Sequence, residues 1–153
     1  MESMKRWRPT VIAVAAALIM GAVGGLLTWL GMEGYRQAAK PLFTPPDWLF
    51  PVVWTVLYLL MGIGMGRVWR RGGTTAAWIY GGQLVLNVLW CLLFFPMAAY
   101  GAAFWLLCLL LGTVLLMVWL FALRDRGAAL LQLPYVLWLC FALVLNGAVA
   151  LMN

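Results

Sequence analysis

The sequence predicts an all-α membrane protein built as a bundle of five transmembrane helices. Of its 153 residues, 67% are apolar and only 9% are charged, which leaves too little polar surface for a soluble domain of this size. No charged residue lies between Arg71 and Arg124, and this stretch is long enough for two membrane crossings of about 20 residues each. Apolar and polar residues do not alternate with a period of two, so we expect helices and not a β-barrel. The whole chain, residues 1–153, is interpreted as a single membrane domain.

The first predicted helix covers residues 10–30. Its apolar run from Val11 to Leu30 exceeds the roughly 7 to 15 residues of a signal-peptide core, so we interpret it as a membrane span. Gly21 and Gly25 stand at the spacing that lets two helices approach closely. We expect this face to pack against a neighbouring helix of the same chain.

A long first loop is predicted at residues 31–45. It is the longest polar connection in the chain, and it exceeds the usual length of a link between two helices. The pattern leaves two functions open, a lid or recognition loop over a binding site and a plain solvated linker. The polar residues of this loop are Glu33, Tyr35, Arg36, Gln37 and Lys40.

The second predicted helix covers residues 46–67 and begins in a proline-rich segment. Thr44 is a suitable N-cap, and the two prolines that follow it would occupy the first turn, where a missing amide hydrogen costs nothing. Pro51 is then expected inside the helix, which predicts a kink just before Trp54 and Tyr58. Because these two aromatic residues are one turn apart, they share a face. We expect them at the mouth of an apolar ligand pocket.

The third predicted helix, residues 74–95, carries two amide side chains within an apolar span. Gln83 and Asn87 are four residues apart, so they lie on one face, together with Trp90. An amide in hydrocarbon needs a hydrogen-bond partner. The pair therefore either bonds across to other helices or lines a pocket, and we favour the pocket.

The fourth and fifth helices are predicted at residues 98–123 and 128–152. The fourth is rich in leucine, with Trp105 and Trp119 near its two ends as in an aromatic belt, and we assign it a scaffold role. One face of the fifth helix combines aromatic, small and amide side chains. These residues are Tyr135, Trp138, Ala142 and Asn146.

The distribution of basic residues predicts the orientation in the membrane. The N-terminal tail and the loops after the second and fourth helices hold all but two of the 10 lysines and arginines. The remaining two, Arg36 and Lys40, lie in the first loop. Because cytoplasmic loops carry the excess of basic residues, we expect a cytoplasmic N-terminus, with the first loop and the C-terminus on the opposite, trans side. The expected partner of the surface is the lipid bilayer, and no nucleic acid is expected.

The composition offers no evident catalytic or metal-binding chemistry. The chain has no histidine, and none of its 4 acidic residues is expected at mid-membrane depth, so a general base, a metal-ligand set and a proton relay are all missing. The three cysteines lie in apolar runs and are interpreted as buried hydrophobic residues. Conventional catalysis and proton-coupled transport are disfavoured. Ligand binding, passive transfer of hydrophobic ligands and a structural role through helix contacts stay open.

A set of motifs extends over the first loop and the second, third and fifth helices. They are Lys40-Pro41, Pro45-Pro46, Trp48, Pro51, Trp54, Tyr58, Arg67, Gln83, Asn87, Trp90, Pro134-Tyr135, Trp138 and Asn146. Together they resemble the translocator protein family, also called tryptophan-rich sensory proteins or peripheral-type benzodiazepine receptors, over essentially the whole chain. The resemblance implies a five-helix bundle, often a homodimer, that binds porphyrins such as protoporphyrin IX and haem, and isoquinoline or benzodiazepine compounds.

The resemblance also implies a binding pocket beneath the first loop. Tryptophan rings from three helices would stack on the flat ligand, amide groups would orient it, and Arg36 or Lys40 would meet the propionates of a porphyrin. The ligand-binding residues expected on this basis are Trp54, Tyr58, Gln83, Asn87, Trp90, Trp138 and Ala142. A porphyrin is expected as a ligand that is sensed or transferred, and no obligatory cofactor is expected.

Three departures from the family pattern limit what the resemblance implies. Members often carry tryptophan at two loop positions where this chain has Gly34 and Leu42. Porphyrin photodegradation, which is attributed to some members and needs loop and pocket tryptophans, is therefore in doubt, and we do not expect an enzyme. The cholesterol-recognition segment of animal members is also missing after Asn146, so sterol binding through it is not expected.

Overall fold

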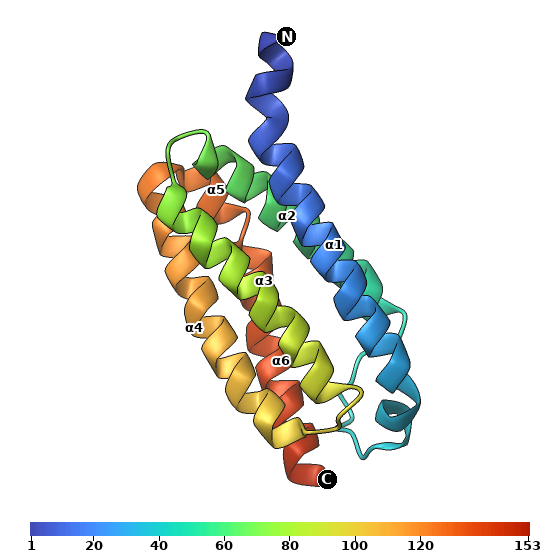
Figure 1. The fold of residues 1–153 in the computed structure, drawn as a ribbon. Coiled ribbons are helices and arrows are strands. Elements are labelled where there is room, and N and C mark those ends of the chain that lie inside the picture. The colour runs from blue at the N-terminus through green and yellow to red at the C-terminus, as the bar shows by residue number, and fades with distance from the viewer.

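The computed structural model describes residues 1–153 and contains helices only (Figure 1). Five spans are long and apolar enough to cross a membrane, where α5 and α6 together form the fifth. This confirms the predicted all-α, five-span membrane fold. The helices are α1 (Glu2–Gln37), α2 (Leu49–Trp69), α3 (Thr74–Phe94), α4 (Tyr100–Arg124), α5 (Arg126–Leu130) and α6 (Leu133–Met152).

The helices run up and down between two ends of the bundle (Figure 1). We call one the loop end, because it holds residues 38–48, the turn at 95–99 and the C-terminus; the other is the amino-terminal end. Helix α1 lies along α2 and α3, α3 packs on α4, and α4 packs on α6. The first turns of α1 project beyond the other helices at the amino-terminal end (Figure 1).

The first helix is longer than the predicted 10–30, and the predicted loop 31–45 is correspondingly shorter. Two features keep the chain helical as far as Gln37. Lys40 donates hydrogen bonds from its Nζ atom to the carbonyl oxygens of Tyr35 and Arg36, at 2.7 and 2.8 Å, which satisfies the last turn. Tyr35 itself is 1% exposed, because its ring packs among phenylalanine rings of α2, of α3 and of the turn after α3.

The second helix starts later than the predicted 46–67, and the expected kink is absent. Thr44 is not its N-cap: the Thr44 Oγ1 donates to the Pro41 carbonyl oxygen at 2.7 Å and closes a separate turn. Because the helix begins at Leu49, Pro51 falls in its first turn, where no helical hydrogen bond is lost. The prediction of a proline kink before Trp54 was therefore wrong.

The third and fourth helices lie close to the predicted 74–95 and 98–123, but the fifth, predicted at 128–152, is divided. Helix α5 is capped by Asp125, whose Oδ1 accepts from the Ala128 amide at 3.0 Å. The chain breaks before α6 because Pro134, in the first turn of α6, has no amide hydrogen to continue the hydrogen-bond pattern.

An ion-pair cluster fastens α2 to the junction of α4 and α5 at the amino-terminal end. Arg67 donates to both carboxylate oxygens of Asp125, at 2.9 and 3.0 Å, and Arg71 lies 3.4 Å from the same carboxylate. Hydrogen bonds from Arg67 lower the pKa of the Asp125 carboxyl to about 2. The carboxylate therefore stays ionised, and it anchors one end of α2.

Candidate ligand-binding site

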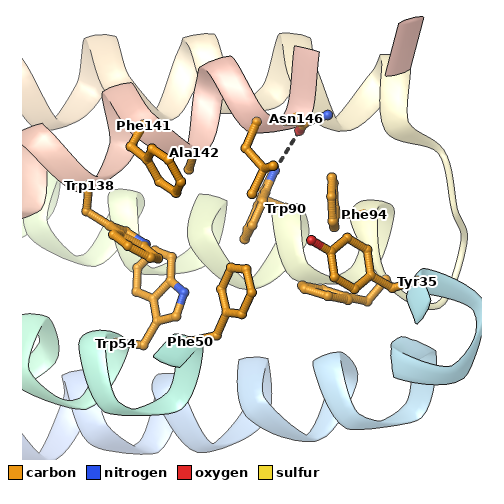
Figure 2. Close-up of a pocket in the computed structure, with 11 residues that line it drawn as sticks. Tyr35, Phe50, Trp54, Trp90, Phe94, Trp138, Phe141, Ala142 and Asn146 are labelled. Atoms are coloured by element: carbon orange, nitrogen blue, oxygen red, sulfur yellow. Dashed lines mark hydrogen bonds between the residues drawn. The ribbon is translucent and has the colours of Figure 1, made fainter. Parts of the chain in front are cut away.

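Aromatic rings from α2, α3 and α6 converge in the half of the bundle nearest the loop end (Figure 2). The ring centroid of Trp54 lies 6.3 Å from that of Trp90 and 6.4 Å from that of Trp138. Phe50, one turn before Trp54, meets Trp138 edge to face at 6.0 Å. These three helices therefore meet through tryptophan and phenylalanine side chains at this level.

The rings enclose a cavity that is nearly full. Its volume is about 10 Å³, which is hardly room for one water molecule. Of its 11 lining residues, 10 are hydrophobic. The lining residues are Tyr35, Phe50, Trp54, Trp90, Phe94, Phe95, Trp138, Phe141, Ala142, Leu145 and Asn146, and we call them the aromatic layer.

Two polar groups of the aromatic layer have no hydrogen-bond partner. They are the Tyr35 hydroxyl and the Trp138 Nε1, both buried. The indole of Trp90, in contrast, has a partner, since its Nε1 donates to the Asn146 Oδ1 at 3.0 Å (Figure 2). A buried polar group without a partner costs about 1 to 3 kcal/mol. The aromatic layer thus keeps two unpaired groups, both able to donate, among apolar surfaces.

A chain of polar side chains crosses the bundle on the amino-terminal side of the aromatic layer. The Tyr58 hydroxyl donates to the Asn87 Oδ1 at 2.9 Å, and the Asn87 Nδ2 donates to the Tyr135 hydroxyl at 3.3 Å. The Tyr135 hydroxyl in turn donates to the Gln83 Oε1 at 2.7 Å. The amides of Gln83 and Asn87 therefore bond across helices, and neither residue lines the cavity.

A second, larger cavity lies on the other side of Trp54. It is a groove of about 730 Å³ between α1 and α2, and Cys91 and Phe95 form its floor toward α3. Phe50, Trp54 and Phe95 line both this groove and the aromatic layer. We call it the lateral groove. The volume is within the range of small-molecule sites, whereas the cavity of the aromatic layer is not.

The two basic residues of the loop end are already engaged. Arg36 lines the lateral groove and donates from its Nε to the Asp47 Oδ2 at 2.9 Å. Lys40 is occupied with the carbonyl oxygens at the end of α1, and its Nζ lies 4.8 Å from the ring centroid of Tyr35. Neither side chain lines the cavity of the aromatic layer.

The structure divides the predicted ligand-binding residues into three groups. Trp54, Trp90, Trp138 and Ala142 surround the aromatic layer's cavity. Gln83 and Asn87 belong to the hydrogen-bonded chain, and Tyr58 joins that chain while its ring lines the groove. The other seven lining residues were not predicted as ligand-binding. They are Tyr35, Phe50, Phe94, Phe95, Phe141, Leu145 and Asn146.

The position of these residues in the sequence explains why they were missed. Phe50 and Phe141 lie one helical turn from Trp54 and Trp138, so an extension of each aromatic stripe by one turn would have found them. Tyr35 was assigned to the first loop. Only the continuation of α1 brings its ring into the bundle.

Five apolar spans around a tryptophan-lined interior define a small multi-pass membrane protein. The profile of the TspO/MBR family matches residues 13–152, and the chain belongs to this family. It is 35% identical to the tryptophan-rich protein TspO of Archaeoglobus fulgidus, over 94% of this chain and 95% of that protein. The tryptophan-rich sensory protein of Cereibacter sphaeroides is 36% identical over 74% of this chain and 73% of its own length. The translocator protein of Ovis aries is 35% identical over 90% of this chain and 88% of its own length. The resemblance drawn from the sequence motifs is thus confirmed.

Proposed function

We propose that this chain binds flat hydrophobic ligands of the tetrapyrrole class within the bilayer, and that the ligand enters the aromatic layer between α2 and α6. The observation that carries the proposal is the pair of unpaired polar groups, the Tyr35 hydroxyl and the Trp138 Nε1, in an otherwise apolar cavity. A tetrapyrrole carries hydrogen-bond acceptors on a large flat body. It would satisfy both groups and stack on the indole rings.

The ligand would take the place of contacts between rings. Helices α2 and α6 meet at this level through Trp54, Phe50 and Trp138, whose centroids are 6.0 to 6.4 Å apart. Separation of these rings by the thickness of one flat molecule, about 3.5 Å, exchanges one set of van der Waals contacts for another. The ion-pair cluster at Asp125 would hold the far end of α2 during this movement.

The polar edge of the ligand is assigned to the two unpaired groups. Arg36 and Lys40 were expected from the sequence to meet the propionates, but neither side chain lines the cavity of the aromatic layer. We therefore assign the acceptors of the ligand to Tyr35 and Trp138.

The test is a titration of the detergent-purified protein with protoporphyrin IX, followed by quenching of tryptophan fluorescence. Tyr35→Phe and Trp138→Phe keep a ring at each position and remove the polar group. Loss of one hydrogen bond of about 0.5 to 1.5 kcal/mol should weaken binding about two- to tenfold in each variant. Trp119→Phe, at an exposed position far from the cavity, is the control for the loss of one fluorophore, and its affinity should equal that of the wild type.

Two results of this titration would contradict the proposal. If the wild type binds neither protoporphyrin IX nor an isoquinoline competitor, the tetrapyrrole function is rejected, and a structural role through helix contacts is favoured. Unchanged affinity in both Tyr35→Phe and Trp138→Phe would reject the aromatic layer as the site.

We also propose that the amino-terminal end faces the cytoplasm. All basic residues except Arg36 and Lys40 belong to the N-terminal part of α1 or to segments around Arg70 and Arg124, at one end of the bundle. The positive-inside rule assigns that end to the cytoplasmic side. Labelling of a single cysteine introduced at Leu42, in right-side-out vesicles, should succeed with a membrane-impermeant maleimide, and protection of this cysteine would contradict the orientation.

A further inference from the structure

The lateral groove is a binding site of a different kind from the aromatic layer. We propose that it holds one acyl chain of a zwitterionic phospholipid, whose headgroup lies against the charged residues at the loop end. This proposal does not depend on the tetrapyrrole function, because it concerns another cavity and another class of ligand.

The walls of the groove are suited to a hydrocarbon chain. On α1 the wall is thinned by Gly21, Gly24 and Gly25, and no atom lies within 4 Å of the place where a side chain on Gly25 would begin. The three hydroxyl groups in the wall all have partners: Thr28 and Thr55 each donate to the carbonyl oxygen four residues before them, at 2.9 and 2.7 Å, and Tyr58 donates to the Asn87 Oδ1 at 2.9 Å. No unpaired buried polar atom faces this space. The wall therefore holds no buried polar atom that a ligand would have to pair with.

The groove is open to the bilayer along α1. Leu18, Ala22 and Gly25 line it and are exposed on the outside of the bundle. These residues lie within an uncharged apolar stretch of a span with a mean hydropathy of 2.3. A lipid chain can therefore reach the groove directly from the hydrocarbon region and need not pass through the loop.

Charge complementarity at the loop end selects the headgroup. Arg36 forms an ion pair with Asp47 at 2.9 Å and lies 3.9 Å from the carboxylate of Glu33, so a cation is flanked by two anions. A phosphate can approach the guanidinium, and the ammonium of the same headgroup can approach the carboxylates. A headgroup with a net negative charge would meet the second carboxylate without compensation. The indoles of Trp29 and Trp48, 73% and 65% exposed, line this end of the groove and are typical of the headgroup level.

The experiment uses native mass spectrometry of the full-length protein in detergent, after delipidation and addition of a defined lipid. The lipids are phosphatidylcholine, phosphatidylglycerol and a diacylglycerol with the same acyl chains. We expect one phosphatidylcholine to be retained, at least about fivefold more than either of the other two lipids. A fivefold ratio corresponds to about 1 kcal/mol, the net contribution of one typical hydrogen bond.

Two variants locate the lipid. Gly25→Phe places a ring in the groove from a position where its Cβ would meet nothing within 4 Å, and it should reduce retention of phosphatidylcholine at least tenfold. Gly112→Phe adds the same side chain at an uncontacted, exposed position of α4 and should retain the lipid as the wild type does. The triple variant Glu33→Gln, Arg36→Gln and Asp47→Asn removes the cation and both carboxylates, and it should lose the preference for phosphatidylcholine over phosphatidylglycerol.

The proposal is overturned if Gly25→Phe and Gly112→Phe retain equal amounts of lipid, or if the three lipids are retained equally by the wild type. It is also overturned if protoporphyrin IX displaces the lipid one for one and Gly25→Phe abolishes protoporphyrin binding, because the groove would then be the tetrapyrrole site. Absence of tetrapyrrole binding with retention of phosphatidylcholine would reject the proposed function alone.

Discussion

Trp54 stands between two regions that differ in volume and in the state of their polar groups. On one side, the aromatic layer leaves a cavity of about 10 Å³ and keeps two buried polar groups unpaired. On the other, the lateral groove has a volume of about 730 Å³, and every buried hydroxyl in its wall has a partner. The larger space thus has no buried hydroxyl without a partner, whereas the smaller one is lined by two unpaired polar groups. Unpaired polar groups indicate better than volume where a ligand with hydrogen-bond acceptors would bind.

The largest expected difference between the two regions comes from substitutions of the glycines in α1. A side chain on Gly31 would collide with the backbone of Phe95, which lines both regions, whereas a side chain on Gly25 would meet nothing within 4 Å. Because a backbone cannot be displaced without moving α1, we expect Gly31→Ala to lower the free energy of unfolding by about 3 kcal/mol.

Gly25→Ala is the matched control in the same helix. It should leave stability unchanged or raise it by up to about 1 kcal/mol, because alanine favours the helix over glycine. Thermal unfolding in detergent measures both variants. Equal midpoints for Gly31→Ala and Gly25→Ala would contradict the assignment of one glycine to a packed contact and the other to open space.

A second test of the comparison removes the ion pairs that hold α2 at the amino-terminal end. Helix α2 matters here because it forms a wall of both regions. The depressed pKa of Asp125, about 2 against an ordinary 3.8, means that its ion pairs contribute full stability above about pH 4 and lose that contribution as the pH falls toward 2. Asp125→Asn should lower the free energy of unfolding by about 2 kcal/mol at neutral pH.

The pH dependence of thermal unfolding in the wild type and in Asp125→Asn tests this role of the carboxylate. Thermal midpoints of the wild type should fall on acidification through this range, and those of Asp125→Asn should fall less. If the two curves stay parallel, the carboxylate is not what holds α2 in place.

A third prediction sharpens the contrast between paired and unpaired groups within the aromatic layer. Trp90→Phe removes a hydrogen bond of 3.0 Å and leaves the Asn146 Oδ1 unpaired, so it should cost about 1 to 2 kcal/mol beyond the change in ring size. Trp138→Phe removes a group that had no partner, and it should cost less than Trp90→Phe. Chemical denaturation of the two variants compares them directly. A larger loss in Trp138→Phe would mean that its Nε1 is not an unpaired group in the folded protein.

The smallest effect is expected at the mouth of the groove. Arg36 and Asp47 form an ion pair whose side chains are 57% and 43% exposed, so solvent screens their attraction. Arg36→Gln should change the free energy of unfolding by less than about 1 kcal/mol. A larger loss in thermal unfolding would show that the ion pair is a structural fastening of the loop end and not an available headgroup contact.

The fold could be predicted from the sequence because hydropathy and charge specify membrane spans directly. Helix ends were less accessible, since they depend on contacts made at a distance. Lys40 extends α1 by reaching back to its final carbonyl oxygens, and Thr44 closes a turn with Pro41 when it could have capped α2. Such local alternatives have similar propensities, and tertiary packing decides between them.

The candidate site was predicted in its residue types and only partly in its geometry. Helical periodicity placed Trp54, Trp90 and Trp138 on inward faces, and these rings do meet. Periodicity could not show that Gln83 and Asn87 bond to tyrosines of other helices, because the partners lie far away in the sequence. The lateral groove also had no signal of its own. Gly21 and Gly25 share the spacing of a packing face, but Gly21 faces the ring of Tyr58 and Gly25 faces open space.

The most direct measurement is the distance between spin labels on α2 and α6, with and without protoporphyrin IX. Labels at Val52 and Leu137, which are 52% and 70% exposed, report the separation of the two helices at the aromatic layer once the three native cysteines are replaced. Binding within the aromatic layer predicts that protoporphyrin IX increases this distance by about 3.5 Å, the contact thickness of a flat ligand. A saturating ligand that leaves the distance unchanged would contradict the account.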